Sequence, residues 1–213
     1  MENAKVLLVE DDPLARQLIE LFIDKSERYT LVGAIASASM AEVYLCKQKV
    51  DLILMDVCTA LNANGIDVAS KIKKSYPQVK IIVITSQPEY SYISRAKEVG
   101  VDSFWYKTVI AEDFIVLLDR TMSGERVYPD NTPTLAIGNA LSVEFTDREL
   151  DVLRLIVAGE RDAEIADHLN ITIRTVKAHL QNMKDKTGFR NRTELAVRAR
   201  DVGLVIVEPR SEN

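Results

Sequence analysis

Short apolar runs alternate with stretches of helical periodicity over the first 122 residues of the chain. The run at 52–55 is apolar without period-two alternation, which is typical of a strand buried on both faces of a parallel sheet. Alternation of such strands with helical patterns predicts βαβ units and therefore an α/β domain. We expect five strands, at 5–9, 31–35, 52–55, 80–84 and 103–106.

A helical pattern follows each expected strand. After Asp12 and Pro13, where a proline suits the first turn of a helix, the apolar residues Leu14, Leu18, Leu21 and Phe22 are spaced three or four apart. Further helices are expected at 39–48, 66–76, 88–99 and 111–122.

Glycine, proline, asparagine and serine accumulate at 123–145, where the apolar periodicity fades. Beyond residue 145 the sequence pattern predicts helices. Thr146 and Glu149 have the spacing of a capping box for a helix that ends near Gly159, and three more helices are expected at about 162–169, 173–187 and 193–202. The pattern predicts an α/β domain at 1–122, a linker at 123–141 and an all-α four-helix domain at 142–207.

The 213 residues, of which 47% are hydrophobic and 28% charged, suit two globular domains. The net charge of −5 is unevenly placed. The window 170–200 holds eight basic and two acidic residues, so it carries 8 − 2 = +6 and the remainder −5 − 6 = −11. This asymmetry indicates a polyanion-binding surface on an otherwise acidic protein.

No apolar run approaches the length of a membrane span, and the chain starts directly with a strand pattern rather than a signal peptide. We therefore expect a cytoplasmic protein with no membrane partner. Cys46 and Cys58 lack metal-ligand spacing and are interpreted as structural thiols.

Polar side chains stand where four of the expected strands end. Asp56 follows the buried run, Glu10 and Asp11 follow the first strand, and Thr85 and Lys107 follow the last two. Each alone could be an ordinary capping or loop residue. Because the carboxyl ends of parallel strands form the ligand crevice of an open sheet, their joint placement indicates a functional site.

The acids of this cluster form an all-oxygen site that suits Mg²⁺. With such a cation, Lys107 could neutralise the oxygens of a phosphoryl group passing to Asp56. Thr85 would then bond a phosphoryl oxygen.

The motifs VEDDP at 9–13, LILMD at 52–56, VITS at 83–86 and YKT at 106–108 resemble the receiver domains of bacterial two-component response regulators. The resemblance implies a flavodoxin-like five-stranded parallel sheet of order 2-1-3-4-5. It implies the following site: Asp56 as phosphoacceptor, Asp11, Asp56 and the Cys58 main-chain carbonyl as Mg²⁺ ligands, Glu10 as outer acid, Thr85 and Phe104 as switch residues and Lys107 as phosphate partner.

One departure from the family concerns the loop after the phosphoacceptor. Receivers usually have proline four residues after this aspartate and glycine eight after it, whereas this chain has Ala60 and, at nine, Gly65. The loop at 59–64 therefore carries one extra residue, and its conformation does not follow from the family pattern.

In the second domain, two helices joined by a short turn, with a basic third helix, meet the helix-turn-helix pattern, whose third helix enters the major groove. Lys177, Ala178 and Gln181 share a face suited to reading bases. The flanking donors suit phosphates. The remaining candidates for DNA contact are Arg174, Thr175, His179, Lys184 and Lys186. A helical protein-interaction domain with a solvated basic face is the alternative.

The motifs TDREL at 146–150, EIADHLNIT at 164–172, TVKAH at 175–179 and NRTELAVRARDVGL at 191–204 resemble the LuxR-type DNA-binding domain. This resemblance implies dimeric binding of double-stranded DNA, with the fourth helix as dimer contact. Receiver followed by this domain is the architecture of NarL/FixJ-type response regulators, which implies a sensor histidine kinase as partner, a homodimer when phosphorylated, and a regulator rather than an enzyme.

Two other functions are compatible with parts of the pattern. A phosphohydrolase of the haloacid-dehalogenase kind would use Asp56 as nucleophile, but its D-x-D-x-T pattern needs a second carboxylate where this chain has Cys58. A phosphorylation-independent regulator would use the receiver only for dimerisation, and the altered loop at 59–64 is compatible with it.

Overall fold

The computed structural model describes residues 3–107 and 111–205, and the chain divides into two compact units. The first comprises residues up to Ser86 together with Ser91–Asp130, and the second comprises Gln87–Tyr90 and the residues from Asn131 onward. Within the described residues, no helix is long and apolar enough to cross a bilayer.

The first unit contains a parallel five-stranded sheet of order β2-β1-β3-β6-β7. Its strands are β1 (Ala4–Val9), β2 (Tyr29–Ile35), β3 (Leu52–Asp56), β6 (Lys80–Thr85) and β7 (Ser103–Tyr106). Counted along the chain, this is the order 2-1-3-4-5, so the predicted flavodoxin-like topology is confirmed. Every residue of the central strand β3 is buried, as its continuous apolar run indicated.

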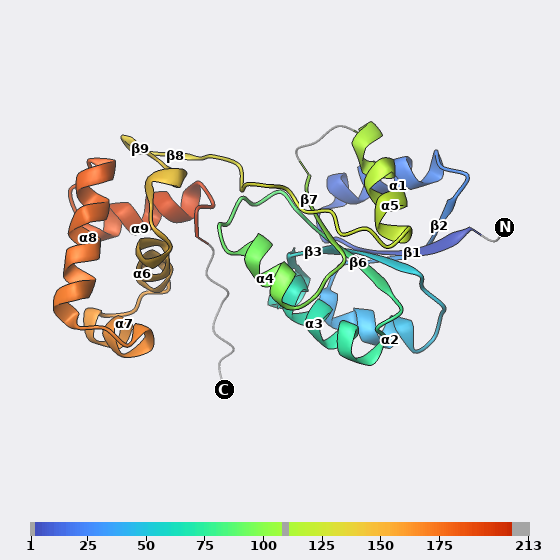
Figure 1. Cartoon of the computed structure of the whole chain (residues 1–213), viewed down its shortest axis with the longest axis horizontal. Helices are drawn as coiled ribbons and strands as arrows, with labels where there is room; N and C mark the ends of the chain where they lie inside the picture. The colour runs from blue at the N-terminus through green and yellow to red at the C-terminus, as the bar shows by residue number, and fades with distance from the viewer. Residues whose placement is uncertain (1–2, 108–110, 206–213) are drawn as a thin grey trace. The chain divides into compact units, whose positions relative to one another are not determined.

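Helices cover both faces of this sheet, with α1 and α5 on one face and α2, α3 and α4 on the other (Figure 1). Their bounds are α1 (Pro13–Asp24), α2 (Ala41–Leu45) after a short 3₁₀ turn at Ala38–Met40, α3 (Gly65–Ser75), α4 (Tyr92–Glu98) and α5 (Ala111–Met122).

Two helices differ from the sequence pattern. The helix expected at 88–99 begins only at Tyr92, after a turn at Tyr90 and Ser91. In α1, the buried residues are Ile19 and Ile23, whereas the predicted stripe of leucines faces solvent.

Parts of the predicted linker are ordered within the two units. In the first unit, Phe104 N donates to Val127 O at 2.8 Å, and Tyr128 OH donates to Val101 O at 2.6 Å, which holds this segment along the outer edge of β7. In the second unit, β8 (Ala136–Ile137) and β9 (Ala140–Leu141) form a small hairpin. The domain boundaries themselves remain predictions.

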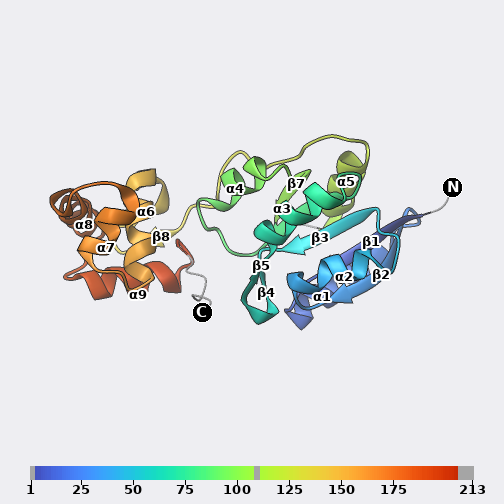
Figure 2. The same cartoon turned by 90° about the horizontal axis from the view of Figure 1, so that it is seen from below.

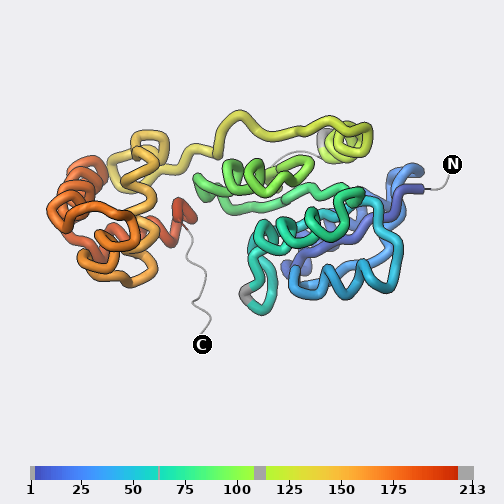
Figure 3. The backbone as a smooth tube through the Cα atoms, turned by 60° about the horizontal axis from the view of Figure 1, so that its bottom comes forward, coloured from blue at the N-terminus to red at the C-terminus, as the bar shows by residue number. Residues whose placement is uncertain are grey.

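Four helices build the part of the second unit that the structure describes, and the backbone tube in Figure 3 follows them in succession. They are α6 (Asp147–Val157), α7 (Asp162–Leu169), α8 (Ile173–Thr187) and α9 (Arg192–Asp201). Thr146 and Glu149 form the predicted capping box of α6. Gly188, at φ 77°, ends α8 in the left-handed conformation that favours glycine.

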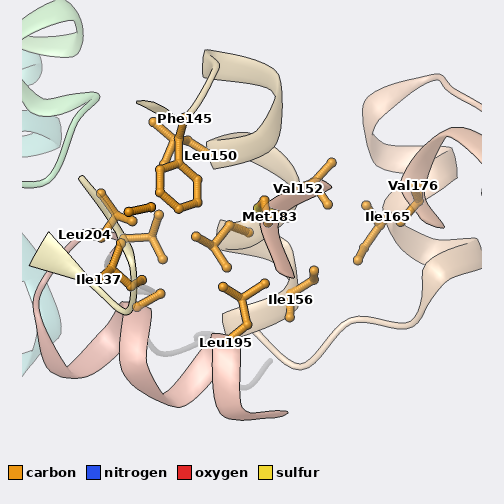
Figure 4. Packing of buried hydrophobic residues seen from close by; sticks show 14 of the residues in the cluster. Ile137, Phe145, Leu150, Val152, Ile156, Ile165, Val176, Met183, Leu195 and Leu204 are labelled. Carbon is orange, nitrogen blue, oxygen red and sulfur yellow. The ribbon is translucent and has the colours of Figure 1, made fainter. Parts of the chain in front are cut away.

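The core of the second unit draws on all four helices and on the hairpin (Figure 4). Leu153, Val176 and Met183 are fully buried, and Ile137 of β8 is nearly so. This core holds α7 and α8 in place around their short connection, which is the arrangement that a helix-turn-helix needs.

Candidate functional site

The predicted acid cluster assembles at the carboxyl ends of β1 and β3. Asp56 is the last residue of β3, and Glu10 and Asp11 directly follow β1, the strand that pairs with β3. One carboxylate oxygen of each of the three lies within 4.8 Å of the others. Glu10 is fully buried, Asp56 is 6% exposed and Asp11 is exposed, so the cluster opens toward solvent on the Asp11 side.

Lys107 joins this cluster from the end of β7. Its Nζ lies 2.5 Å from Glu10 Oε2 and 2.9 Å from Asp56 Oδ2. Burial raises the pKa of Asp56 to about 7 against the attraction of Lys107, with Glu10 adding to the rise. Burial alone would lower the pKa of Lys107, but Asp56 and Glu10 outweigh it and raise that pKa. The ammonium therefore stays charged among the acids.

The donor set fits the cation that the sequence indicates. Three carboxylates with converging oxygens and no nitrogen or sulfur ligand suit a hard divalent ion such as Mg²⁺. Lys107 leaves part of the negative charge uncompensated, and a cation on the open Asp11 side would offset it. The role of the Cys58 main-chain carbonyl remains a prediction.

Thr85 and Phe104 are both almost fully buried. Thr85 ends β6, and its main-chain oxygen accepts a hydrogen bond from Lys107 N at 2.8 Å. The ring of Phe104 meets Tyr106 edge-on, with centroids 5.1 Å apart. The predicted switch residues thus occupy neighbouring strands, with the predicted phosphate partner beside them.

The loop that follows Asp56, the predicted phosphoacceptor, forms a miniature hairpin (Figure 2). It consists of β4 (Cys58–Thr59), a 3₁₀ turn at Ala60–Asn62 and β5 (Ala63–Asn64). Thr59 Oγ1 donates to Ala63 O at 2.6 Å and accepts from Ala38 N at 3.0 Å, which ties the hairpin to the neighbouring loop. Leu61, at the tip, has φ 63° and is 81% exposed.

The hairpin returns the chain to the position where α3 must start. Asn64 caps α3 by accepting from Ile66 N at 2.8 Å, and Gly65 N donates to Val57 O at 2.8 Å. A Cβ on Gly65 would lie 1.9 Å from the main-chain oxygen of Asp56. Gly65 therefore permits close approach of α3 to the main chain of Asp56, the predicted phosphoacceptor.

Most predicted DNA contacts lie on the outer side of α8. Arg174, Lys177, Ala178 and Gln181 are exposed. Thr175, His179 and Lys184 flank them and are half-buried. Val176 and Met183, which alternate with these residues along the helix, are the fully buried contacts that fix its orientation.

Two of the candidates already have partners within the unit. Lys186 Nζ lies 2.7 Å from Glu149 Oε2 and donates to Glu144 O at 2.8 Å, so it stabilises the packing of α8 on α6 and is a poor candidate for a phosphate contact. Gln181 Nε2 donates to Asp185 Oδ1 at 2.7 Å, a bond at the surface that a base edge could replace.

Sequence reasoning missed the residues that position the site. Arg16 Nη2 donates to the carbonyl of Glu10 at 2.6 Å, which anchors the acidic loop to α1. Asn64 holds the start of α3. Asparagine before glycine at a helix start is a capping signal that could have identified Asn64, whereas nothing in the sequence marks Arg16.

Comparisons with known proteins agree with this geometry. The family model described as "Response regulator receiver domain" matches residues 6–119, and the model described as "Bacterial regulatory proteins, luxR family" matches residues 143–199. The response regulator protein VraR of Staphylococcus epidermidis is 33% identical over 207 residues, which make up 94% of this chain and 98% of that protein. VraR of Staphylococcus aureus is 32% identical over the same shares.

A solved structure shares the fold. RcsB from Salmonella enterica serovar Typhimurium, determined bound to a promoter, superposes with a TM-score of 0.60 at 21% identity and covers 94% of this chain and 100% of its own. The comparisons with these relatives therefore do not favour the alternative of a phosphohydrolase. The chain belongs to the two-component response regulators that join a receiver domain to a LuxR-type helix-turn-helix domain.

Proposed function

We propose that this chain is a transcriptional regulator in which a sensor histidine kinase transfers a phosphoryl group to Asp56, and that this transfer controls dimerisation and binding to specific duplex DNA. The observation that carries the proposal is the buried Lys107 ammonium held between Glu10 and Asp56 beside an open acidic position. This arrangement serves transfer of an anionic group to a carboxylate.

In this proposal each residue of the site has a chemical task. Glu10, Asp11 and Asp56 would hold Mg²⁺, which when bound supplies charge neutralisation. A carboxylate oxygen of Asp56 attacks the phosphorus and the donor nitrogen leaves. Lys107 shifts its ion pair from the carboxylates to an incoming phosphoryl oxygen. Thr85 turns its hydroxyl toward the adduct, and the space it vacates lets Phe104 reorient.

The reading of DNA is assigned to the exposed side of α8. Lys177 and Gln181 have the donors and acceptors that match guanine and adenine edges, and Ala178 suits a thymine methyl group. Arg174 and Lys184 suit phosphates, as do Thr175 and His179 at the edges of the helix. A dimer would place two such helices in successive major grooves of a symmetric site.

The reading face can be tested by separating specificity from affinity. Lys177→Ala and Gln181→Ala should each lower the preference for a selected site by about 1 to 3 kcal/mol, because each removes a base contact. Arg174→Ala and Lys184→Ala should weaken binding to all sequences and reduce its salt dependence. Titrations on a duplex selected from a random pool and on a scrambled one measure both effects, and an unchanged preference in Gln181→Ala would contradict the assignment.

The proposed function as a whole can be tested by measuring how far phosphorylation changes the affinity for DNA. Phosphorylated full-length protein should bind the selected duplex more tightly than the unphosphorylated protein by about 1 to 3 kcal/mol, the usual range of coupling free energies. Gel-shift titrations with acetyl phosphate and Mg²⁺, at one fixed salt concentration, measure the difference, and Asp56→Asn should show none. Equal affinities for the wild type would favour the phosphorylation-independent alternative.

Two residues after Asp56, Cys58 replaces the second carboxylate that a phosphohydrolase uses as general acid, which supports a role as regulator rather than enzyme. The cytoplasmic location expected from the sequence remains a prediction.

A further inference from the structure

Helix α8, whose residues the structure describes throughout, begins with an exposed isoleucine. Ile173 is its first residue and is 45% exposed. The other large apolar side chains of this helix face the core: Val176 and Met183 are fully buried, and Leu180 is half-buried against the same core. Ile173 lies outside the core that the described residues of this unit form, so its side chain contributes little to the stability of the fold.

A single exposed apolar residue is ordinary on a protein surface, but Ile173 lies where contact with DNA is expected. In a helix-turn-helix, the N-terminal residues of the recognition helix are the ones that contact base edges. Ile173 directly precedes Arg174 and lies one helical turn before Lys177, and both of these residues are exposed. The isoleucine therefore lies among the side chains proposed to meet DNA.

The start of α8 holds this side chain in a defined position. Thr172 caps the helix by accepting a hydrogen bond from Thr175 N at 3.1 Å, and the two hydroxyl oxygens lie 2.8 Å apart. An isoleucine in a helix has one strongly preferred rotamer, and its Cβ is tilted toward the N-terminal end of the helix. Ile173 therefore points toward the end of α8 that contacts bases, and it loses little conformational entropy when it makes a contact.

The isoleucine side chain has neither a donor nor an acceptor for the polar groups of DNA. Among the groups that base pairs present in the major groove, the C5-methyl of thymine is the apolar one. Placing the same side chain against a polar base edge would remove water from that edge without replacing its hydrogen bond. Ile173 therefore favours thymine over the other bases at the position that it covers.

We propose that Ile173 is a further specificity-determining residue of this chain, whose side chain contacts the C5-methyl group of a thymine in the recognised duplex. The proposal rests on the proposed function, since it names a base that the regulator reads. The position of that base is also restricted. Four helical residues span about 6 Å and successive base pairs are about 3.4 Å apart, so the thymine should lie within about two base pairs of the pair that Lys177 contacts.

Replacement of thymine by deoxyuridine tests the contact without changing the protein. Deoxyuridine lacks only the C5-methyl group and keeps the hydrogen-bonding groups of thymine. In a duplex selected from a random pool, each thymine is replaced in turn, and binding of the full chain with acetyl phosphate and Mg²⁺ is titrated at one salt concentration. At the thymine that Ile173 covers, the replacement should weaken binding roughly fourfold, the factor expected for loss of one buried methyl group.

Protein variants then assign the thymine to Ile173, because Ala178 is also suited to a thymine methyl group. Ile173→Ala should make binding insensitive to deoxyuridine at that one position, whereas Gln181→Ala should keep the fourfold loss there. Ile173 is exposed and alanine favours helices, so Ile173→Ala keeps the fold, which urea unfolding verifies. Val143→Ala is the matched control, because Val143 is 68% exposed in the same unit but lies outside α8, and this variant should respond to deoxyuridine as the wild type does.

The outcomes separate this proposal from the proposed function. A wild type that tolerates deoxyuridine at every position, or a loss that persists unchanged in Ile173→Ala, would overturn the role of Ile173. So would a sensitive thymine more than about two base pairs from the pair at which Lys177→Ala loses discrimination. Failure of the proposed function gives a different result, in which the wild type does not prefer the selected duplex to a scrambled one, and the role of Ile173 then fails with it.

Discussion

Asp56→Asn is expected to abolish phosphorylation of this chain. The amide occupies nearly the same volume as the carboxylate but has no anionic oxygen to attack phosphorus. After incubation with acetyl phosphate and Mg²⁺, intact-mass measurement should show one added phosphoryl group on the wild type and none on the variant. Removal of Mg²⁺ by a chelator should also suppress the adduct on the wild type, because the acids at the strand ends then repel the donor.

Asp67→Asn is the matched control for this experiment. Asp67 is an exposed carboxylate on α3, paired with Arg95 and outside the acid cluster, so its variant should be phosphorylated like the wild type. Asp56→Asn should fold at least as stably as the wild type near neutral pH, since burial raises the pKa of Asp56 and the anion is a cost to the folded state. An adduct that persists in Asp56→Asn would place the phosphoacceptor elsewhere.

The acid cluster could be predicted from the sequence because the sheet is parallel. Asp56, Glu10 and Lys107 lie far apart along the chain, but Asp56 ends a strand and the other two directly follow one. Parallel strands bring their carboxyl ends to one edge. The side chains then converge without any information about loops. For the same reason Thr85, at the end of β6, could be predicted to lie beside these residues.

The orientation of α1 could not be predicted in the same way. Leu14, Leu18 and Leu21 have helical spacing, and so do Ile19 and Ile23. Periodicity identifies a helix but does not say which of two apolar rows faces the core. That choice depends on the helix's neighbours, here the sheet and α5, which the local pattern does not contain.

The loop after Asp56 was unpredictable for a different reason. Its hairpin depends on the hydrogen bond between Thr59 and the amide of Ala38, a contact across 21 residues. Lys186 is a similar case in the second unit. Its positive charge predicted a contact with DNA. In the structure, however, it forms an ion pair with Glu149, 37 residues away in the sequence.

Gly65→Ala is expected to damage the first unit severely, although alanine favours helices over glycine by about 1 kcal/mol. The added Cβ would lie 1.9 Å from Asp56 O and 2.8 Å from Met55 Cγ. Backbone cannot yield as a flexible side chain does, so α3 must move or β3 must bend. We expect the free energy of unfolding to fall by about 1 to 3 kcal/mol. Phosphorylation should also slow, because the clash falls on the main chain of Asp56, the proposed phosphoacceptor.

Gly100→Ala is the control variant, because it replaces a glycine by alanine without creating a steric clash. Gly100 has φ 78°, and a Cβ there would meet no atom within 4 Å. Its substitution should cost only the strain of a left-handed alanine, about 1 to 2 kcal/mol, and should leave the phosphorylation rate unchanged. Urea unfolding and time-resolved intact mass on both variants make the comparison. If Gly65→Ala were as stable as the wild type and phosphorylated at the same rate, the close approach of α3 to Asp56 would not be a requirement of the site.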